Sequence, residues 1–291
     1  MRQICFYFFI SLLGFTYLNI GVAKSTNSFQ IKSNVVDTAK FKCTYKFKFL
    51  IDSTKMTFKD NDLYVIQIGD NFTKSYCYQL FYFDSIYNAK GKLDVSPMMD
   101  YYNKNKPVDG SFSSDFLEGL YKFTNGFFSF YVYKDYIKEK VTVTDYISYH
   151  KFIYDDELKP QDWIVMEDTM SVLGYLCQKA VCSFRGRDWE AWFTPDIPVS
   201  EGPYKFYGLP GLIMKLEDNE SHYIFEIQGI EQINEPIYMT ANNSYRKIDR
   251  LTFLKLRMNR TGTDLAAMDL AKVGINANSV YHYDHIERDY K

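Results

Sequence analysis

The sequence predicts a mainly β protein: a single large antiparallel sheet or sandwich-like domain with a short helical excursion and C-terminal helices. Aromatic residues make up 18% of the chain, with 26 Tyr and 24 Phe, and these residue types favour pleated, half-buried surfaces. Several runs alternate apolar and polar residues with a period of two, which is typical of strands with one face in the core. Apolar residues at helical spacing begin only after Pro236.

Residues 1–23 have the features of a secretory signal peptide. Arg2 precedes an apolar run at residues 4–18, and small residues lead to an expected cleavage site after Ala23. A membrane anchor is the alternative, but the run is short for a span, and no later run is long enough to cross a bilayer. We therefore expect residues 24–291 to form one exported β-rich domain, in the periplasm, associated with the outer membrane or at the cell surface.

The charge balance gives no reason to expect a nucleic-acid partner. Cleavage after Ala23 removes Arg2, so 34 − 1 = 33 basic residues face 36 acidic ones, a net charge of −3. A chain of this balance has no excess of positive charge with which to neutralise phosphates.

Four cysteines remain after cleavage, namely Cys43, Cys77, Cys177 and Cys182. In an oxidising compartment they allow three disulfide connectivities. Five residues of extended strand span about 16 Å, whereas a disulfide needs Cα atoms about 4.4–6.8 Å apart. Cys177 and Cys182 could therefore pair only if the chain bends between them, and the connectivity stays open.

The first third of the mature chain is predicted to be an antiparallel meander. Residues 41–50 alternate aromatic residues with lysines, as expected for a strand with one buried and one solvent face. Residues 63–68 and 75–83 are further predicted strands, joined by a turn at residues 69–71.

The next part of the chain changes character before strands resume. Residues 84–118 contain many chain-breaking residues and are predicted to form a surface excursion with a short helix over 97–102. Strands are expected again at residues 127–133 and 139–149.

Two hairpins and two helices complete the expected order. One hairpin joins residues 174–184 to 188–194 across Gly186, which can supply the positive φ of a tight turn. The other joins residues 212–216 to 223–227. Apolar residues at helical spacing, including Ile248, Leu251 and Met258, predict a helix over 248–258, and a second helix is expected from Thr263 to Gly274.

The segment between the two hairpins is rich in proline and glycine. Leu209, Pro210, Gly211 and Leu212 predict a type II turn, because proline suits its second position and glycine its third. Gly208 is expected to allow a close backbone approach. The predicted structural turn residues are Gly202, Pro203, Gly208, Leu209, Pro210 and Gly211. The segment is either a core-facing bend that sets the register of two hairpins or the floor of a binding groove.

The same segment carries a resemblance. Its hexapeptide Gly-Leu-Pro-Gly-Leu-Ile at residues 208–213 is accompanied by related motifs at 174–180, 184–187, 191–194 and 202–206. The chain thus resembles the GLPGLI family of exported envelope proteins of Gram-negative bacteria, most clearly over residues 163–230. The resemblance implies an exported β-rich protein, and it implies work beside outer-membrane transporters because some members are encoded near them. It implies no established activity.

Five residues near this segment are candidate binding residues: Arg185, Arg187, Trp192, Tyr204 and Tyr207. The two arginines flank a turn and could hold a carboxylate or phosphate in bidentate fashion. The alternative is that they pair with Asp188 or another acidic neighbour. Trp189 and Trp192 point to opposite faces of a strand, so only one of them can line a groove.

Catalytic motifs are sparse. The chain contains no Gly-x-Ser-x-Gly elbow, no His-Glu-x-x-His helix and no glycine-rich phosphate loop. His282 and His285 could touch a metal, but solvated side chains are the better interpretation of two histidines near a terminus. We therefore expect no metal and no cofactor.

Three functions remain open from the sequence. The leading hypothesis is a non-enzymatic envelope protein that binds a ligand or a partner such as an outer-membrane transporter. The second is a secreted hydrolase of unrecognised type that uses Asp188, Glu190 and Asp196. The third is a purely structural envelope protein.

Overall fold

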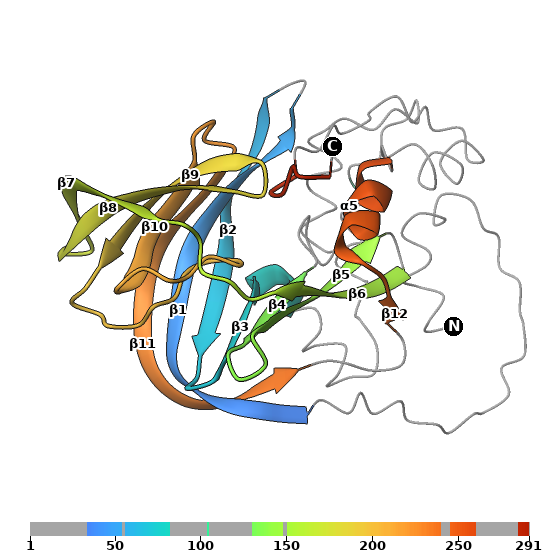
Figure 1. Cartoon of the computed structure of the whole chain (residues 1–291), viewed down its shortest axis with the longest axis horizontal. Coiled ribbons are helices and arrows are strands. Elements are labelled where there is room, and N and C mark those ends of the chain that lie inside the picture. The colour runs from blue at the N-terminus through green and yellow to red at the C-terminus, as the bar shows by residue number, and fades with distance from the viewer. Residues whose placement is uncertain are drawn as a thin grey trace, which may run out of the picture.

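Twelve strands form one continuous sheet in the order β12-β6-β5-β4-β3-β2-β1-β11-β10-β9-β8-β7 (Figure 1). The computed structural model describes residues 34–53, 56–81, 104, 130–147, 150–239, 245–259 and 285–290. Neighbouring strands pair antiparallel throughout, except that β12 lies parallel to β6. The predicted single large, mainly antiparallel sheet is confirmed.

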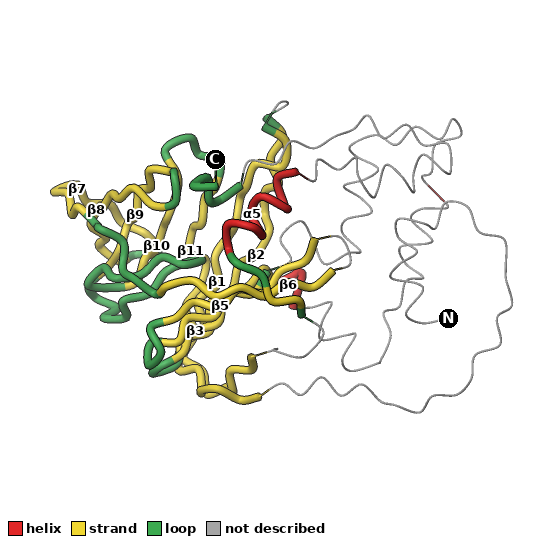
Figure 2. The backbone as a smooth tube through the Cα atoms, turned by 45° about the vertical axis from the view of Figure 1, so that its right-hand side comes forward, coloured by secondary structure: helices red, strands yellow, loops and turns green. Residues whose placement is uncertain are grey.

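The strands are β1 (Asn34–Asp52), β2 (Thr57–Ile68), β3 (Phe72–Cys77), β4 (Tyr131–Asp135), β5 (Lys140–Ile147), β6 (His150–Glu157), β7 (Ile164–Val172), β8 (Tyr175–Phe184), β9 (Arg187–Thr194), β10 (Leu212–Asp218), β11 (Tyr223–Met239) and β12 (Arg246–Lys247). One helix, α5 (Arg250–Asn259), follows β12. Figure 2 shows α5 packed beside β6.

The long central strands β1 and β11 hold the two halves of the sheet together. They pair over most of their length, with register shifts that include the one between Thr44 and Tyr45. Such bulges bend and twist a strand, and the sheet curves so that β7–β10 and β3–β6 stand on either side of β1 and β11 (Figure 1). The curvature gives the sheet a concave face.

Aromatic side chains form the core on this concave face, as the alternation in β1 predicts. Phe47 and Phe225 stack with ring centroids 4.2 Å apart, and Tyr64 meets Phe225 edge-on at 5.1 Å. All three side chains are fully buried, and each buried ring of this size contributes about 1.5–3 kcal/mol by removal from water.

Residues 197–211 cross the concave face and close it. The hydroxyl of Tyr45 donates to the carbonyl of Ile213 at 2.7 Å. The ammonium of Lys134 donates to the carbonyls of Gly202 at 3.2 Å and Phe206 at 2.8 Å. Lys134 of β4 therefore holds the irregular segment through hydrogen bonds to its backbone, and Tyr45 of β1 holds the beginning of β10, which follows it.

The hairpin predictions are confirmed, with the turn chemistry visible. Arg185 and Gly186 form the two-residue connection of β8 and β9 with φ of 53° and 77°. Two positive φ angles define the type I′ turn, whose twist matches that of a hairpin. The hairpin of β10 and β11 also lies where expected.

Other elements differ from the sequence predictions. The strand predicted over 75–83 ends at Cys77, and residues 78–81 form a helical turn. The strands β6 and β7 were not predicted: β6 buries only Tyr154 fully and β7 only Val172, so neither alternates in hydrophobicity.

The helix predicted over 248–258 is confirmed as α5. Asp249 caps it, because its carboxylate accepts from the Thr252 N–H at 2.9 Å. Phe253 and Leu254 are its buried residues, whereas the predicted core residue Leu251 is 42% exposed. The helices predicted over 97–102 and 263–274 and the signal peptide lie outside the described residues.

Within the described part of the chain, no helix is long and apolar enough to cross a membrane. Cys43, Cys77, Cys177 and Cys182 are all buried free thiols, so none of the three disulfide connectivities is formed. Burial above all raises the pKa of the Cys43 and Cys182 thiols to about 12, which keeps both protonated and unreactive at neutral pH.

Candidate functional site

A cavity of about 300 Å³ lies between the β6–β7 connection and the tip of the β8–β9 hairpin. Its volume is at the lower end of the range of small-molecule sites. It is lined by Val141, Glu157, Leu158, Lys159, Pro160, Gln161, Asp162, Ser183, Phe184, Arg185 and Lys205. The lining combines apolar side chains with both cations and carboxylates.

Arg185 lines the cavity from the hairpin turn and is fixed by two carboxylates. Its Nη2 donates to both oxygens of Asp156 at 2.8 and 3.0 Å, and its Nη1 to Asp289 at 3.1 Å. The Nε–H of Arg185 is buried and has no hydrogen-bond partner among the residues that the structure describes. The guanidinium is thus held rigidly while one of its donors is left unused.

Lys205 lies behind Arg185 in the segment that crosses the concave face. Its ammonium is 2.8 Å from Asp156 and 2.5 Å from Glu287, and its side chain is almost completely buried. The hydroxyl of Tyr204 donates to Glu287 at 2.5 Å. A buried lysine at this position is therefore matched by two carboxylates.

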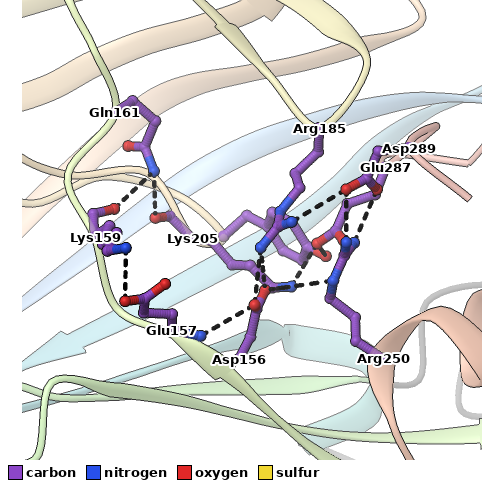
Figure 3. Close-up of polar contacts among 10 residues, drawn as sticks. Asp156, Glu157, Lys159, Gln161, Arg185, Lys205, Arg250, Glu287 and Asp289 are labelled. Atoms are coloured by element: carbon purple, nitrogen blue, oxygen red, sulfur yellow. Dashed lines mark hydrogen bonds and ion pairs between the residues drawn. The ribbon is translucent and has the colours of Figure 1, made fainter.

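Arg250, from the start of α5, completes the network. It contacts Glu287 and donates to the two oxygens of Asp289 at 2.8 and 2.6 Å. Figure 3 shows Arg185, Lys205 and Arg250 converging on the carboxylates from the hairpin, the crossing segment and the helix. Three cations thus face three carboxylates, and the network behind the cavity is electrically balanced.

The electrostatics keep these groups ionised. Burial alone raises the pKa of Glu287, but Lys205 and Arg250 outweigh it and the net pKa is lowered. Burial also raises the pKa of Asp156, but the nearby charges of Lys205 and Arg185 outweigh this effect, and the net pKa is lowered. The network therefore consists of charged pairs and contains no proton donor poised near neutral pH.

A second buried cluster surrounds Arg187. Its side chain has no exposed surface; its Nη1 lies 2.5 Å from Asp218, and two of its N–H groups donate to the His285 carbonyl at 3.0 and 2.7 Å. Arg187 therefore anchors the C-terminal segment. Neither arginine pairs with Asp188, whose carboxylate accepts from Ser183 instead.

Asp218, Glu220 and His222 are close enough together to suggest metal ligands, since their ligand atoms lie within 4.8 Å of one another. However, Asp218 is bound by Arg187, and Glu220 contacts Arg288. Because arginines already engage both carboxylates, we assign no metal to this cluster.

A third buried pair, Lys134 and Glu201, lies 2.7 Å apart. Glu201 also accepts from Thr73 at 2.6 Å and from Tyr136. Tyr207 packs edge-on against Tyr136 with ring centroids 5.7 Å apart. Tyr207 thus belongs to this cluster and not to the lining of the cavity.

Trp192 lies on the outer face of β9, away from the cavity. Its Nε1 donates to Glu190 at 2.8 Å, and Lys179 pairs with Glu190 at 2.5 Å. Trp189 is buried in the core, so the prediction that the two tryptophans face opposite sides is correct. Burial raises the pKa of Glu190, but the hydrogen bonds from Lys179 and Trp192 outweigh it, and the net pKa is lowered.

The structure thus brings together only some of the predicted residues. Of the five candidate binding residues, Arg185 alone lines the cavity, while Arg187 and Tyr204 are buried beside the C-terminal segment. Asp188, Glu190 and Asp196, the carboxylates of the hydrolase hypothesis, are absent from its lining. The presence of Lys205 between Tyr204 and Phe206 was a usable signal, because a lysine flanked by buried aromatics needs a partner.

The central turn differs in detail from the predicted type II turn. The Gly211 N–H donates to the Leu209 carbonyl at 2.8 Å, and the Leu212 N–H donates to Ile197 at 3.1 Å. The chain therefore makes a three-residue turn around Pro210. A Cβ on Gly208 would lie 2.5 Å from Pro160 Cβ, which confirms the expected close approach.

A comparison with protein families finds a match on this central stretch. A model of a family described as a protein of unknown function (Porph_ging) matches residues 185–215. None of the curated proteins matches the chain.

Two solved structures of PNGF-II, in the P21 and C2 space groups, are similar to the chain. Their sequence identities are 17% and 16% and their TM-scores 0.47 and 0.44. Each similarity covers 76% of this chain, but only 33% and 32% of the two PNGF-II chains. The chain thus spans about a third of the length of these proteins.

Proposed function

We propose that the chain is an exported, non-enzymatic protein of the cell envelope that binds a small polar molecule in the cavity beside Arg185. The observation that carries this proposal is the way the cavity is built. Its polar wall is held from behind by the balanced network of Asp156, Glu287 and Asp289 with their cations. A wall fixed in this way is preorganised, which lowers the entropic cost of binding.

The chemistry of the described groups supports binding over catalysis. No histidine or cysteine is among the residues that line the cavity. The neighbouring carboxylates of Asp156 and Glu287 are kept ionised by cations, whereas a general acid needs a pKa near the working pH.

Export and an envelope partner belong to the same proposal. Export rests on the features of residues 1–23, and a partner such as an outer-membrane transporter rests on the resemblance to exported envelope proteins. Cell fractionation of the producing bacterium tests the location: recovery of the full-length, uncleaved chain in the cytoplasm would contradict it.

Thermal-shift screening tests the binding role. Wild-type protein, Ser183→Trp and Ser171→Trp are each heated with a panel of amino acids, organic acids, sugars and nucleotides. Ser183 lines the cavity, so the new indole fills it, whereas the exposed Ser171 lies away from it on β7. A ligand at 100 times its Kd stabilises a protein by about 2.7 kcal/mol.

We expect at least one compound to raise the Tm of wild type and Ser171→Trp but not that of Ser183→Trp. Equal shifts in all three proteins would place binding elsewhere, and the absence of any shift would overturn the proposal.

A further inference from the structure

We propose that the end of the β7–β8 hairpin is the docking site for a partner protein that presents an apolar patch bordered by lysine or arginine side chains. We call residues 173–176 the hairpin tip. This inference rests on the envelope partner in the proposed function and specifies its chemistry, but it does not depend on what the cavity binds. It comes from exposed apolar side chains, a strained leucine and unpaired negative charge.

The tip carries three large apolar side chains that are exposed. Leu173 is 55% exposed, Tyr175 36% and Leu176 63%. β7 is the last strand of the sheet and β8 is its neighbour, and Figures 1 and 2 show both at the outer end of the described part of the chain. Single exposed apolar residues are normal on a protein surface, but a group of them at one place is typical of an interaction site.

The backbone of the tip strains Leu173. Leu173 and Gly174 connect β7 to β8 with φ of 49° and 83°, so they form a type I′ turn, which favours Asn, Asp or Gly at its first position. A leucine is disfavoured in this left-handed conformation. Arg185, at the same position of the β8–β9 turn, binds Asp156 and Asp289 in return, whereas more than half of Leu173 is exposed. The leucine weakens the turn with little gain in packing, which indicates a role for its exposed side chain.

The unpaired charges of the hairpin and its surroundings are negative. Glu167 and Asp168 of β7 are exposed. Asp196 is exposed as well and lies near the start of β8, because the pKa of Cys177 is raised by burial and, to a lesser extent, by the charge of Asp196. None of these three carboxylates makes an ion pair within the described part of the chain. Lys179 is the only cation of residues 164–184, and a carboxylate of β9 already pairs with it at 2.5 Å.

These charges decide between three occupants of the tip. Like charges across an interface oppose association, whereas opposite charges steer and select a partner. A second copy docking tip to tip would bring the carboxylates of two hairpins together, and a membrane surface with anionic lipids would repel them as well. A protein whose apolar patch is bordered by cations matches both the leucines and the carboxylates.

The contact is made by side chains and not by the free backbone edge of β7. The register of β7 with β8 shifts between Val165 and Thr169, and such a bulge disrupts the edge as a template for strand addition. The side chains of the tip lie beyond this bulge and stay available to a partner.

Photo-crosslinking in the producing bacterium tests the docking site. The photoreactive amino acid p-benzoylphenylalanine replaces Leu176 at the tip in one culture and Glu226, which is exposed on β11, in a control culture. We expect irradiation to join the tip probe, and not the control probe, to one protein. Mass spectrometry of the joined peptide should locate the contact on a surface where apolar residues lie next to lysine or arginine.

Leu173→Asn separates docking from stability, because Asn-Gly is a favoured pair for a type I′ turn. The melting temperature of this variant should equal or exceed that of wild type. The yield from the tip probe should nevertheless fall about tenfold, as expected when an interface loses an apolar anchor.

Reversing the charge of the hairpin tests the cationic border of the partner. Glu167→Lys combined with Asp168→Lys should lower the yield from the tip probe by a similar factor, while lysines at these positions still protect the edge of β7. Glu226→Lys makes the same kind of change on β11 and should leave the yield unchanged.

The docking site would be overturned by the absence of a product from the tip probe, by equal products from both probes, or by a yield that Leu173→Asn leaves unchanged. A product with lipid, with a second copy of the chain or with a surface that lacks cations would overturn the chemistry of the partner. Failure of the proposed function is distinguishable, since fractionation detects a chain that is not exported and the thermal-shift panel detects a cavity without a ligand, and neither depends on the tip.

Discussion

At the residue scale, Glu287 is the group on which the charge network depends most. It has no exposed surface and contacts Lys205, Arg250 and Tyr204. Removing one partner of a buried ion pair leaves the others uncompensated, which typically costs about 3–5 kcal/mol. We therefore expect Glu287→Gln to lose stability of this order in urea unfolding at pH 7, whereas Glu226→Gln on the exposed face of β11 should be nearly neutral.

The pH dependence gives an independent check on the same residue. Because the pKa of Glu287 is lowered in the folded protein, its contribution is fully present above the unfolded pKa of about 4.3 and is lost as the pH falls through the folded pKa. The acid limb of the stability curve should be shallower in Glu287→Gln than in wild type. Identical acid limbs would show that the network does not hold Glu287 ionised.

Position 211 has no room for a side chain, so it requires glycine. A Cβ there would lie 2.0 Å from the carbonyl oxygen of Thr194, a backbone atom that cannot move aside cheaply. Gly211→Ala should therefore destabilise the protein by at least the about 1–3 kcal/mol typical of overpacking. In Gly229→Ala the new methyl group meets nothing within 4 Å, so this control should fold normally. Equal melting temperatures for the two variants would refute the close approach.

At the element scale, the edge strand β7 combines exposed apolar residues with features that oppose strand addition. Ile164 is 64% exposed, and the register with β8 shifts between Val165 and Thr169. Glu167 and Asp168 lie in this bulge. Bulges and charges are the means by which natural sheets protect their edges.

We predict that the charges of β7 keep the protein from associating through that edge. The double change Glu167→Val and Asp168→Val should produce dimers or larger species in sedimentation experiments at concentrations where wild type shows none. Glu226→Val exposes a valine on a strand with neighbours on both sides and should not. Association of both variants would attribute the effect to surface hydrophobicity and not to the free edge.

The same contrast explains which elements the sequence could predict. The residues of β1 alternate between apolar and polar because one face of the strand meets the core. The hairpin of β8 and β9 is recognisable from Gly186, whose positive φ its turn requires. Strand β6 meets a helix and an ionic network and β7 meets solvent on most of its length, so neither carries a period of two. The alternation of apolar and polar residues identifies strands with one buried and one exposed face, and it cannot identify strands whose two faces have similar surroundings.

At the scale of the whole molecule, the candidate site depends on contacts that no local pattern contains. Arg185 was singled out from its place in a turn, but its partners lie 29 and 104 residues away, at Asp156 and Asp289. Such pairs are defined only once the sheet has curved and the C-terminal segment has docked. An arginine in a turn can therefore be recognised from the sequence, but the cavity that it lines cannot.

The C-terminal segment closes the structure by joining distant parts of the sheet. Residues 285–290 are held by Arg187 through the His285 carbonyl, by Lys205 through Glu287 and by Arg250 through Asp289. Deleting residues 285–291 would leave three buried or half-buried cations without these acceptors. We therefore expect the truncated protein to melt at a much lower temperature and to be cleaved rapidly by protease near α5 and the β8–β9 turn.

Adding the missing segment as a separate peptide tests whether the truncated protein has lost specific contacts or has lost the ability to fold. A peptide of residues 283–291 added to the truncated protein should restore most of the lost melting temperature, because the peptide returns Glu287 and Asp289 to the same cations. The same peptide with Glu287→Gln should restore much less, since it leaves Lys205 with one carboxylate partner instead of two. Equal rescue by both peptides would mean that apolar contacts of the segment, such as those of the buried Ile286 and Tyr290, hold it in place and that the ionic network is secondary.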